Sequence, residues 1–424
     1  MRFILLTGLT IIYFCGYSQT LPVISQTEVS RIENILAADN MQGRKTFTPG
    51  IEKAANFIEK EFKDAGLKPF PGSKEGFRQS FNMIKPVSSE INATIDGNPI
   101  DSKNIFVFST ASTINVTPGD HYEKIYVKKG SNFRSILYKY HDSSANVLIF
   151  VDTSFAKIFA RLAGNPIPIF EGTGNRIFIL TSAQPQEYNI QIKQELKKQP
   201  LTNLVGIIPG KSKPDEYVIF SAHYDHLGIG KPDAKGDSIY NGANDDASGT
   251  TAVISLAQYF AKLHNNERTL VFVTFTAEEI GEFGSSYYSK KMEAGKVIAM
   301  FNIEMIGTES KWGRNSAYIT GYEKTNMGPI LQNNLVNSQF KFYPDPYPEQ
   351  GLFLRSDNAT LASKGVPAHT ISTSKMDSEK YYHTQGDGVE TLDLANMTEI
   401  IRAIGLSAAS IVSGKDSPTR VVIE

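Results

Sequence analysis

The sequence has one cysteine and almost no net charge, and both shortages exclude classes of function. The 43 basic and 44 acidic residues leave a net charge of −1, so the composition gives no electrostatic reason to expect a nucleic acid or an anionic membrane as a partner. The single cysteine, Cys15, lies in a segment that we expect to be removed, which excludes disulfides and cysteine catalysis in the mature chain. The motifs G-x-S-x-G and H-E-x-x-H are also absent, so the simplest serine-hydrolase and single-zinc metalloprotease interpretations do not apply.

The apolar stretch near the N-terminus is too short to cross a membrane. Residues 3–14 follow Arg2, and their length is that of a signal-peptide core. Ser18 supplies a small residue at the cleavage position, so we predict a signal peptide over residues 1–18 with cleavage before Gln19. The mature chain is then expected to be exported, periplasmic or secreted, without stable membrane insertion.

A lipid anchor on Cys15 is the alternative interpretation of this segment. Lipid attachment usually requires small residues before the cysteine, whereas Tyr13 and Phe14 are bulky. We therefore expect no lipid anchor at Cys15.

The length of the chain indicates one large domain and a smaller one. At 424 residues, the chain exceeds the size at which a single core keeps growing. Helical periodicity gives way to short strand-like segments, and from residue 201 strands alternate with longer helices. We predict an α/β fold with a mixed, mainly parallel sheet flanked by helices, together with a small, mostly β inserted domain. The predicted boundaries are 19–84 for an N-terminal helical part of the main domain, 85–200 for the β-rich insert, 201–414 for the main domain and 415–424 for a tail.

Potential metal ligands follow three apolar strand patterns. The segment YVIFSA leads into His223, TLVFVTFT leads towards Glu278 and Glu279, and VIAMFNI leads into Glu304. Sites in open α/β sheets gather at the carboxyl ends of strands, so we expect these side chains to lie together. Between the first two strands, the acidic turn NGANDDASG presents Asp245 before the following helix.

One further histidine and one further aspartate complete the set. They are His383, in YYHTQGD, and Asp225, two positions after His223. A ligating imidazole usually donates its other nitrogen to a carboxylate, so we expect Asp225 to orient His223. Imidazole and carboxylate ligands without thiolate favour zinc, or less often cobalt or manganese, at a hydrolytic site. Two histidines and three carboxylates are too many for one zinc ion, so the sequence predicts two Zn²⁺ per chain.

The predicted ligands can be divided between two ions if Asp245 bridges them. Each ion then gains one histidine and one further carboxylate. The pairs are His223 with Glu304 and His383 with Glu279. Glu278 is left without a metal, and a free carboxylate beside an activated water can act first as general base and then as general acid, so we assign this role to Glu278.

The order of these motifs resembles a known peptidase family. They are AHYDHLG, NGANDDASG, TAEEIGEFGSSYY, FNIEMIG, RSDNATLASKGVPA and YYHTQGDGVE. The series is similar to that of the zinc aminopeptidases of peptidase clan MH, of the aminopeptidase S and aminopeptidase Y type, with the transferrin receptor and glutamate carboxypeptidase as more distant relatives. The resemblance covers roughly residues 31–67 and 201–414, and residues 85–200 resemble, more weakly, a protease-associated domain.

The resemblance carries expectations about fold, activity and backbone. It implies the phosphorylase/hydrolase-like zinc exopeptidase fold, hydrolysis of N-terminal residues from peptide substrates, and Glu278 as the catalytic base. It also implies a cis peptide bond between Asp245 and Asp246. Many relatives have Asp where this chain has Glu304, so the longer side chain must still reach the metal.

The resemblance further implies residues that contact the substrate. Tyr382 resembles the phenol that stabilises a tetrahedral oxyanion in some members, and Arg355 resembles a substrate-contacting arginine. With Arg355 we predict Asp357 and Asp246 as substrate-binding residues, because nearby carboxylates can hold the free ammonium group of a peptide.

Three other interpretations remain open. One is another activity of the same clan, either a carboxypeptidase or a glutaminyl cyclase. The second is a non-catalytic binding module like the transferrin receptor, which should have lost metal ligands, whereas all five are present here. The third is a two-metal phosphoesterase, which is also built from histidine and aspartate. His226 and His369 have no role left to fill, so we predict hydrogen-bonded structural histidines, and the sequence leaves the oligomeric state open.

Overall fold

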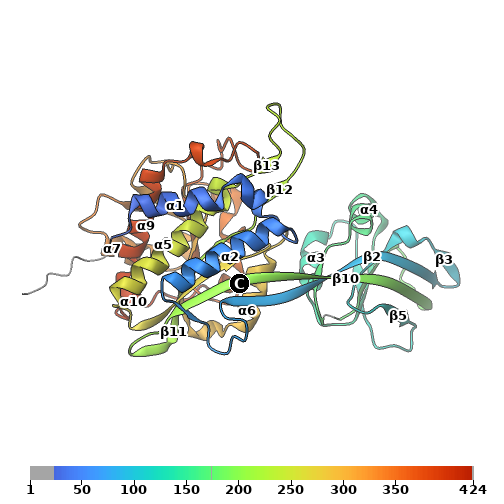
Figure 1. Cartoon of the computed structure of the whole chain (residues 1–424). Helices are drawn as coiled ribbons and strands as arrows, with labels where there is room; N and C mark the ends of the chain where they lie inside the picture. The colour runs from blue at the N-terminus through green and yellow to red at the C-terminus, as the bar shows by residue number, and fades with distance from the viewer. Residues whose placement is uncertain (1–22, 173, 423–424) are drawn as a thin grey trace, which may run out of the picture.

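The computed structural model describes residues 23–172 and 174–422 and divides into a large and a small lobe (Figure 1). The predicted signal peptide and Cys15 lie outside the described residues. The long strands β2 (Arg78–Ile95) and β10 (Tyr188–Ile208) pair along their length and run from one lobe into the other (Figure 1). No described helix is both long and apolar enough to cross a membrane.

A mixed sheet of 12 strands forms the centre of the large lobe and continues into the small one. Its main path has the order β17-β16-β18-β15-β11-β14-β10-β2-β3. Strands β14, β11, β15 and β18 are parallel neighbours, which confirms the predicted mixed sheet with a parallel centre. The strands are β1 (Lys68–Pro69), β2, β3 (Asn98–Ile100), β5 (Thr113–Val116), β8 (Ile169–Phe170), β10, β11 (Lys213–His223), β14 (Arg268–Phe275), β15 (Val297–Ile303), β16 (Ser316–Ile319), β17 (Lys341–Pro344) and β18 (Ala368–Ser372).

Helices cover both faces of this sheet because its central strands are apolar on both sides. On one face Phe220 of β11 stacks on Phe272 of β14 and packs against Phe260 of α5. On the other face Ile219 and Val271 belong to a cluster that includes residues of α6 and α8. The helices of the large lobe are α1 (Gln26–Leu36), α2 (Pro49–Asp64), α5 (Ser248–Leu263), α6 (Phe283–Lys291), α7 (Met327–Asn334), α8 (Ala359–Ala362), α9 (Leu394–Ser407) and α10 (Ala409–Val412).

The small lobe contains a second sheet, with the strand order β4-β9-β7-β6, and two helices. The sequence prediction of a mostly β insert omitted both helices, which have nine residues each and so show little more than two turns of periodicity. In the first, the side chain of Asn132 caps the N-terminus, and Phe133 and Tyr140 are buried. These elements are β4 (Ile105–Phe108), β6 (Glu123–Val127), β7 (Val147–Val151), β9 (Arg176–Leu180), α3 (Phe133–His141) and α4 (Ala156–Gly164).

A buried arginine joins the N-terminal segment to the loops of the sheet edge. Arg44 ends the short helical segment η1 (Asp39–Arg44) and is fully buried. Its guanidinium donates to four main-chain carbonyl groups at 2.6–2.9 Å. The acceptors are Leu36, Tyr224, Asn241 and Gly242. Because Tyr224 follows His223 and Gly242 precedes the acidic turn, Arg44 fixes two segments that carry predicted site residues.

Replacement of Arg44 should destabilise the large lobe. Arg44→Met removes the hydrogen bonds that the guanidinium donates to four main-chain carbonyl groups, and we expect the free energy of unfolding to fall by about 3–5 kcal/mol. Urea unfolding followed by circular dichroism measures this loss. Lys63→Met is the control, because Lys63 is exposed on α2 and its replacement should change stability by no more than about 0.5 kcal/mol. Equal stability of the two variants would contradict this role of Arg44.

Candidate functional site

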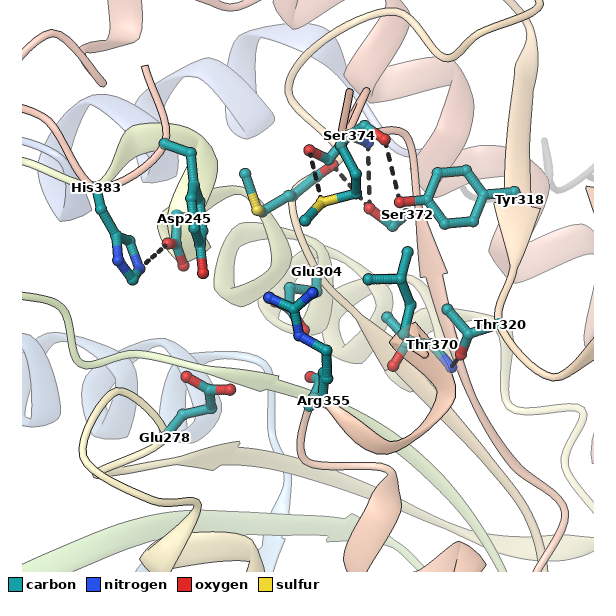
Figure 2. Close-up of a pocket in the computed structure, with 15 residues that line it drawn as sticks. Asp245, Glu278, Glu304, Tyr318, Thr320, Arg355, Thr370, Ser372, Ser374 and His383 are labelled. Atoms are coloured by element: carbon teal, nitrogen blue, oxygen red, sulfur yellow. Dashed lines mark hydrogen bonds and ion pairs between the residues drawn. The ribbon is translucent and has the colours of Figure 1, made fainter. Parts of the chain in front are cut away.

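Side chains from three parallel strands converge at one edge of the central sheet. His223 is the last residue of β11, Glu278 and Glu279 follow β14, and Glu304 follows β15. Carboxyl ends of parallel strands meet at the same edge. Glu278, Glu304, Asp245 and His383 all line one pocket (Figure 2).

Asp245 lies between the two predicted histidine ligands. Its Oδ1 is 3.2 Å from Nε2 of His223. Its Oδ2 is 3.2 Å from Nε2 of His383 (Figure 2). The same nitrogen of His383 is 3.1 Å from Oε2 of Glu279. One aspartate therefore contacts both histidines, as a carboxylate shared by two metal ions must do.

The backbone is left-handed at three positions in or beside these residues. Ala277 precedes Glu278 with φ 62°, Met305 follows Glu304 with φ 52°, and His383 has φ 57°. A residue other than glycine in this region costs about 1–3 kcal/mol, so surrounding contacts must hold each of these segments in place.

Asp246 supports the backbone beneath the site instead of facing the pocket. The Asp245–Asp246 peptide bond is cis, which confirms the expectation drawn from the family resemblance. The carboxylate of Asp246 is fully buried and accepts hydrogen bonds from the main-chain N–H groups of His223, Gly249 and Met305 at 3.0–3.3 Å. Burial raises the pKa of this carboxyl well above its usual value. Asp246 is not among the residues that line the pocket, and its role in substrate binding stays a prediction.

Asp387 is a functional residue that the sequence prediction missed. Its two carboxylate oxygens accept hydrogen bonds from the N–H groups of Asn244, at 2.8 Å, and of Asp245, at 3.0 Å. These bonds fix η4 (Ala243–Ala247), the turn that presents Asp245. The available signal was its place in the motif YYHTQGDGVE, four residues after His383.

Asp225 contacts the site differently from the way predicted. Nδ1 of His223 is 3.1 Å from the main-chain carbonyl oxygen of Asp225, whereas the nearer carboxylate oxygen is 3.9 Å away. The carboxylate accepts a hydrogen bond from the N–H of Glu278 at 3.1 Å. Asp225 therefore orients His223 through its carbonyl group and the Glu278 loop through its side chain.

The two histidines predicted to be structural have different surroundings. His369 bonds to Thr325 and to the carbonyl of Thr320, each at 2.8 Å, which confirms that prediction. Nδ1 of His226 lies 2.7 Å from Oε1 of Glu279, and one ligand atom each of His226, Asp245 and Glu279 lie within 4.8 Å of one another. Nε2 of His226 has no partner among the described residues. His226 is thus a further nitrogen able to hold a metal ion beside Asp245.

Buried carboxylates crowd the site. Burial raises the pKa of Asp225 and of Glu304 to about 7, and that of Asp357 to about 6. Burial also raises the pKa of Glu278 well above its usual value, against the opposing effect of His223. Oε2 of Glu304 and both carboxylate oxygens of Asp357 are buried without a hydrogen-bond partner in the described part of the chain.

This donor set fits divalent metal ions. Imidazole nitrogens and carboxylate oxygens without a thiolate are typical ligands of zinc at hydrolytic sites. A cation would give the unpartnered oxygen of Glu304 a ligand and would offset the repulsion among the neighbouring carboxylates.

The remaining predicted substrate residues lie at different depths. Arg355 is exposed and lines the pocket, whose other lining residues include Thr370, Ser372 and Ser374 (Figure 2). Tyr382 also lines the pocket, and its ring stacks on His383 with a centroid distance of 3.9 Å.

Asp357 is fully buried, and it is not among the residues that line the pocket. Its role in substrate binding stays a prediction.

The segment that carries the site is similar to a family of peptidases. Residues 203–407 match the model of peptidase family M28, and this range contains all five predicted metal ligands. A probable leucine aminopeptidase of Arthroderma otae is 28% identical over 230 residues, which cover 52% of this chain and 58% of the relative. Aminopeptidase YwaD of Bacillus subtilis is 26% identical over 220 residues, which cover 49% of this chain and 44% of the relative. The matched segment thus spans about half the length of these curated relatives.

The likeness of fold extends over nearly the whole chain. BSAP, a zinc aminopeptidase from Bacillus subtilis, has a TM-score of 0.56 at 16% sequence identity, with 96% of this chain and 100% of that chain covered. The aminopeptidase from Aneurinibacillus sp. strain AM-1 has a TM-score of 0.53 at 18% identity, with 95% and 96% covered. The chain therefore has the fold of the zinc aminopeptidases, and its residues 203–407 match the model of peptidase family M28.

Proposed function

We propose that this chain is a zinc-dependent aminopeptidase that removes N-terminal residues from peptides with the help of two Zn²⁺ ions. The observation that carries the proposal is the position of Asp245, 3.2 Å from both His223 and His383. The match to peptidase family M28 and the relatives that are named aminopeptidases support the same activity.

The proposed ligands divide into two sets around Asp245. His223 and Glu304 would hold one ion and His383 and Glu279 the other, with Asp245 shared between them. Bound zinc supplies polarisation of the scissile carbonyl group and lowers the pKa of water to near neutrality. His226, beside Glu279, is in a position to orient that ligand.

Glu278 is the proposed general base and then general acid. It lines the pocket, and its main-chain N–H is held by Asp225. Burial and the neighbouring carboxylates raise its pKa above the usual value of a glutamate, which strengthens it as an acceptor of the water proton and as a donor to the leaving amine.

Two further residues are proposed to contact the substrate. Tyr382 has an exposed fraction of 37% and stacks on His383, so its hydroxyl is available to donate a hydrogen bond to a developing oxyanion. Arg355 lines the same pocket and is proposed to bind an acceptor group of the substrate. Carboxylates of the site would hold the free ammonium group of the peptide.

Export completes the proposal. The predicted signal peptide, residues 1–18, lies outside the described residues. We propose a periplasmic or secreted enzyme that acts on peptides and binds no nucleic acid.

Zinc content and the role of Glu278 can be tested together. We expect about two zinc ions per chain in the wild type and in Glu278→Gln, because Glu278 is not a proposed ligand. The kcat of Glu278→Gln on a panel of aminoacyl nitroanilides should fall about 10²- to 10⁴-fold, because the proton acceptor is lost. Metal analysis and steady-state kinetics measure both quantities. Glu293→Gln, which removes an exposed carboxylate near Lys296, should keep the wild-type kcat. A zinc-free wild type or a fully active Glu278→Gln would contradict the proposal.

Peptides with a free or a blocked amino terminus distinguish the proposed aminopeptidase activity from a carboxypeptidase activity. Acetylation of a peptide's amino group should lower kcat/KM by about 10²-fold or more, because the carboxylates of the site lose their ammonium partner. Amidation of the carboxyl terminus should change kcat/KM little. Mass spectrometry of the products identifies the bond that is cleaved. Cleavage of the acetylated peptide from its carboxyl end would instead indicate a carboxypeptidase.

A further inference from the structure

The small lobe contacts the large lobe at the helix that follows the Glu278 loop. Phe283 begins α6, whereas Phe170 belongs to β8 and His141 ends α3. Phe170 and Phe283 share one buried apolar cluster with Ala277, the residue that precedes Glu278. Phe170 of the small lobe is therefore in the same packed cluster as Ala277, at the start of the Glu278 loop.

The ring of Phe283 lies between two rings of the small lobe. Its centroid is 5.8 Å from that of His141, with an interplanar angle of 25°. It is also 5.8 Å from that of Phe170, with an angle of 89°. Phe283 has an exposed fraction of only 4%, so the small lobe covers and orients this side chain.

Phe283 also closes the Glu278 loop through its backbone. Its N–H donates to the carbonyl of Ala277 at 3.1 Å, and the N–H of Glu282 donates to the carbonyl of Glu278 at 3.0 Å. Ala277 and Glu282 have φ 62° and φ 55° without being glycine. A loop with two such residues needs contacts from outside to keep its shape, and the buried ring of Phe283 provides one.

Two more contacts tie α6 to the small lobe and to the strand ribbon. Lys290 lies 3.9 Å from the ring centroid of Phe170 and 3.3 Å from Oδ2 of Asp142. Tyr287 stacks on Phe81 of β2 with a centroid distance of 4.4 Å. Side chains near the start, the middle and the end of α6 thus contact the small lobe or its connecting strand.

We infer that the small lobe positions the general base: the rings of Phe170 and His141 hold Phe283, and Phe283 holds the loop that carries Glu278. Phe170 and Phe283 are positioning residues in this account, since neither lines the pocket. The inference rests on the proposed function, because it takes Glu278 as the base.

Phe170→Ala tests the inference, because it removes one of the two rings that hold Phe283. We expect kcat to fall about 10- to 100-fold, since a small misplacement of a catalytic group has an effect of this size. KM should stay within about twofold, because the pocket is unchanged. Hydrogen exchange measured by mass spectrometry should be faster in the peptide 276–291, and zinc content should stay at the wild-type value. Phe170→Tyr keeps the ring and should restore both kcat and the exchange rate.

Phe159→Ala is the matched control. Phe159 is fully buried in the small lobe on α4 and packs against Phe106 at a centroid distance of 4.7 Å. It should lower the stability of the small lobe without changing kcat or exchange in peptide 276–291, when all variants are assayed at a temperature at which circular dichroism shows them folded.

Three outcomes would overturn the inference. They are a Phe170→Ala protein with unchanged exchange in peptide 276–291, one with kcat within twofold of the wild type, and an equal loss of kcat in Phe159→Ala. Failure of the proposed function looks different, because the wild type itself would then lack zinc-dependent activity. Hydrogen exchange in peptide 276–291 reports on the Glu278 loop independently of activity. It therefore shows whether Phe170 holds this loop even if the wild type has no zinc-dependent activity.

Discussion

Repulsion among buried carboxylates is the constraint on which the site depends. Asp225, Asp245, Glu278, Glu304 and Asp357 are all buried close to the site, and the pKa of each except Asp245 is raised above its usual value by burial. Asp245 is the exception because His223, His226 and His383 lower its pKa against the effect of burial. Nearby positive charge stabilises such a cluster of buried carboxylates. Histidines and bound metal ions can supply that charge at this site.

Buried side chains hold the backbone around this charge through hydrogen bonds to main-chain groups. The carboxylates of Asp246 and Asp387 accept hydrogen bonds from main-chain N–H groups near Asp245. Arg44 donates hydrogen bonds to carbonyl groups of the flanking loops. Each of these three residues is buried. The proposed ligands therefore lie on segments that are fixed by buried contacts within the protein, as a preorganised site requires.

The sequence predicted the site best where potential metal ligands follow apolar strand patterns. Because His223 ends one such strand and Glu279 and Glu304 follow two others, these side chains could be predicted to meet at one edge of the sheet. The order of the motifs in the chain also resembled one peptidase family. The sequence could not predict the role of a residue where that role depends on the direction in which its side chain points. Asp246 and Asp387 are both acidic residues in Gly-containing turns, and only the fold shows that both face main-chain N–H groups. The short helices α3 and α4 were missed because nine residues hold too little periodicity to outweigh their aromatic and β-branched content.

The paired strands β2 and β10 have a consequence for the mechanics of the molecule. They remain in register from Tyr188 opposite Ile95 to Leu204 opposite Arg78, interrupted only by an irregularity at Glu195 and Leu196. The predicted boundaries at residues 85 and 200 fall inside these strands and not in a loop. Two lobes that are connected by a pair of hydrogen-bonded strands cannot rotate as freely as two lobes on a single-chain linker. Any movement of one lobe relative to the other therefore requires bending or twisting of the paired strands β2 and β10. A cut at residue 85 would split β2 and a cut at residue 200 would split β10. Either cut would interrupt the pairing between these two strands, so the small lobe cannot be removed at these positions without breaking the sheet.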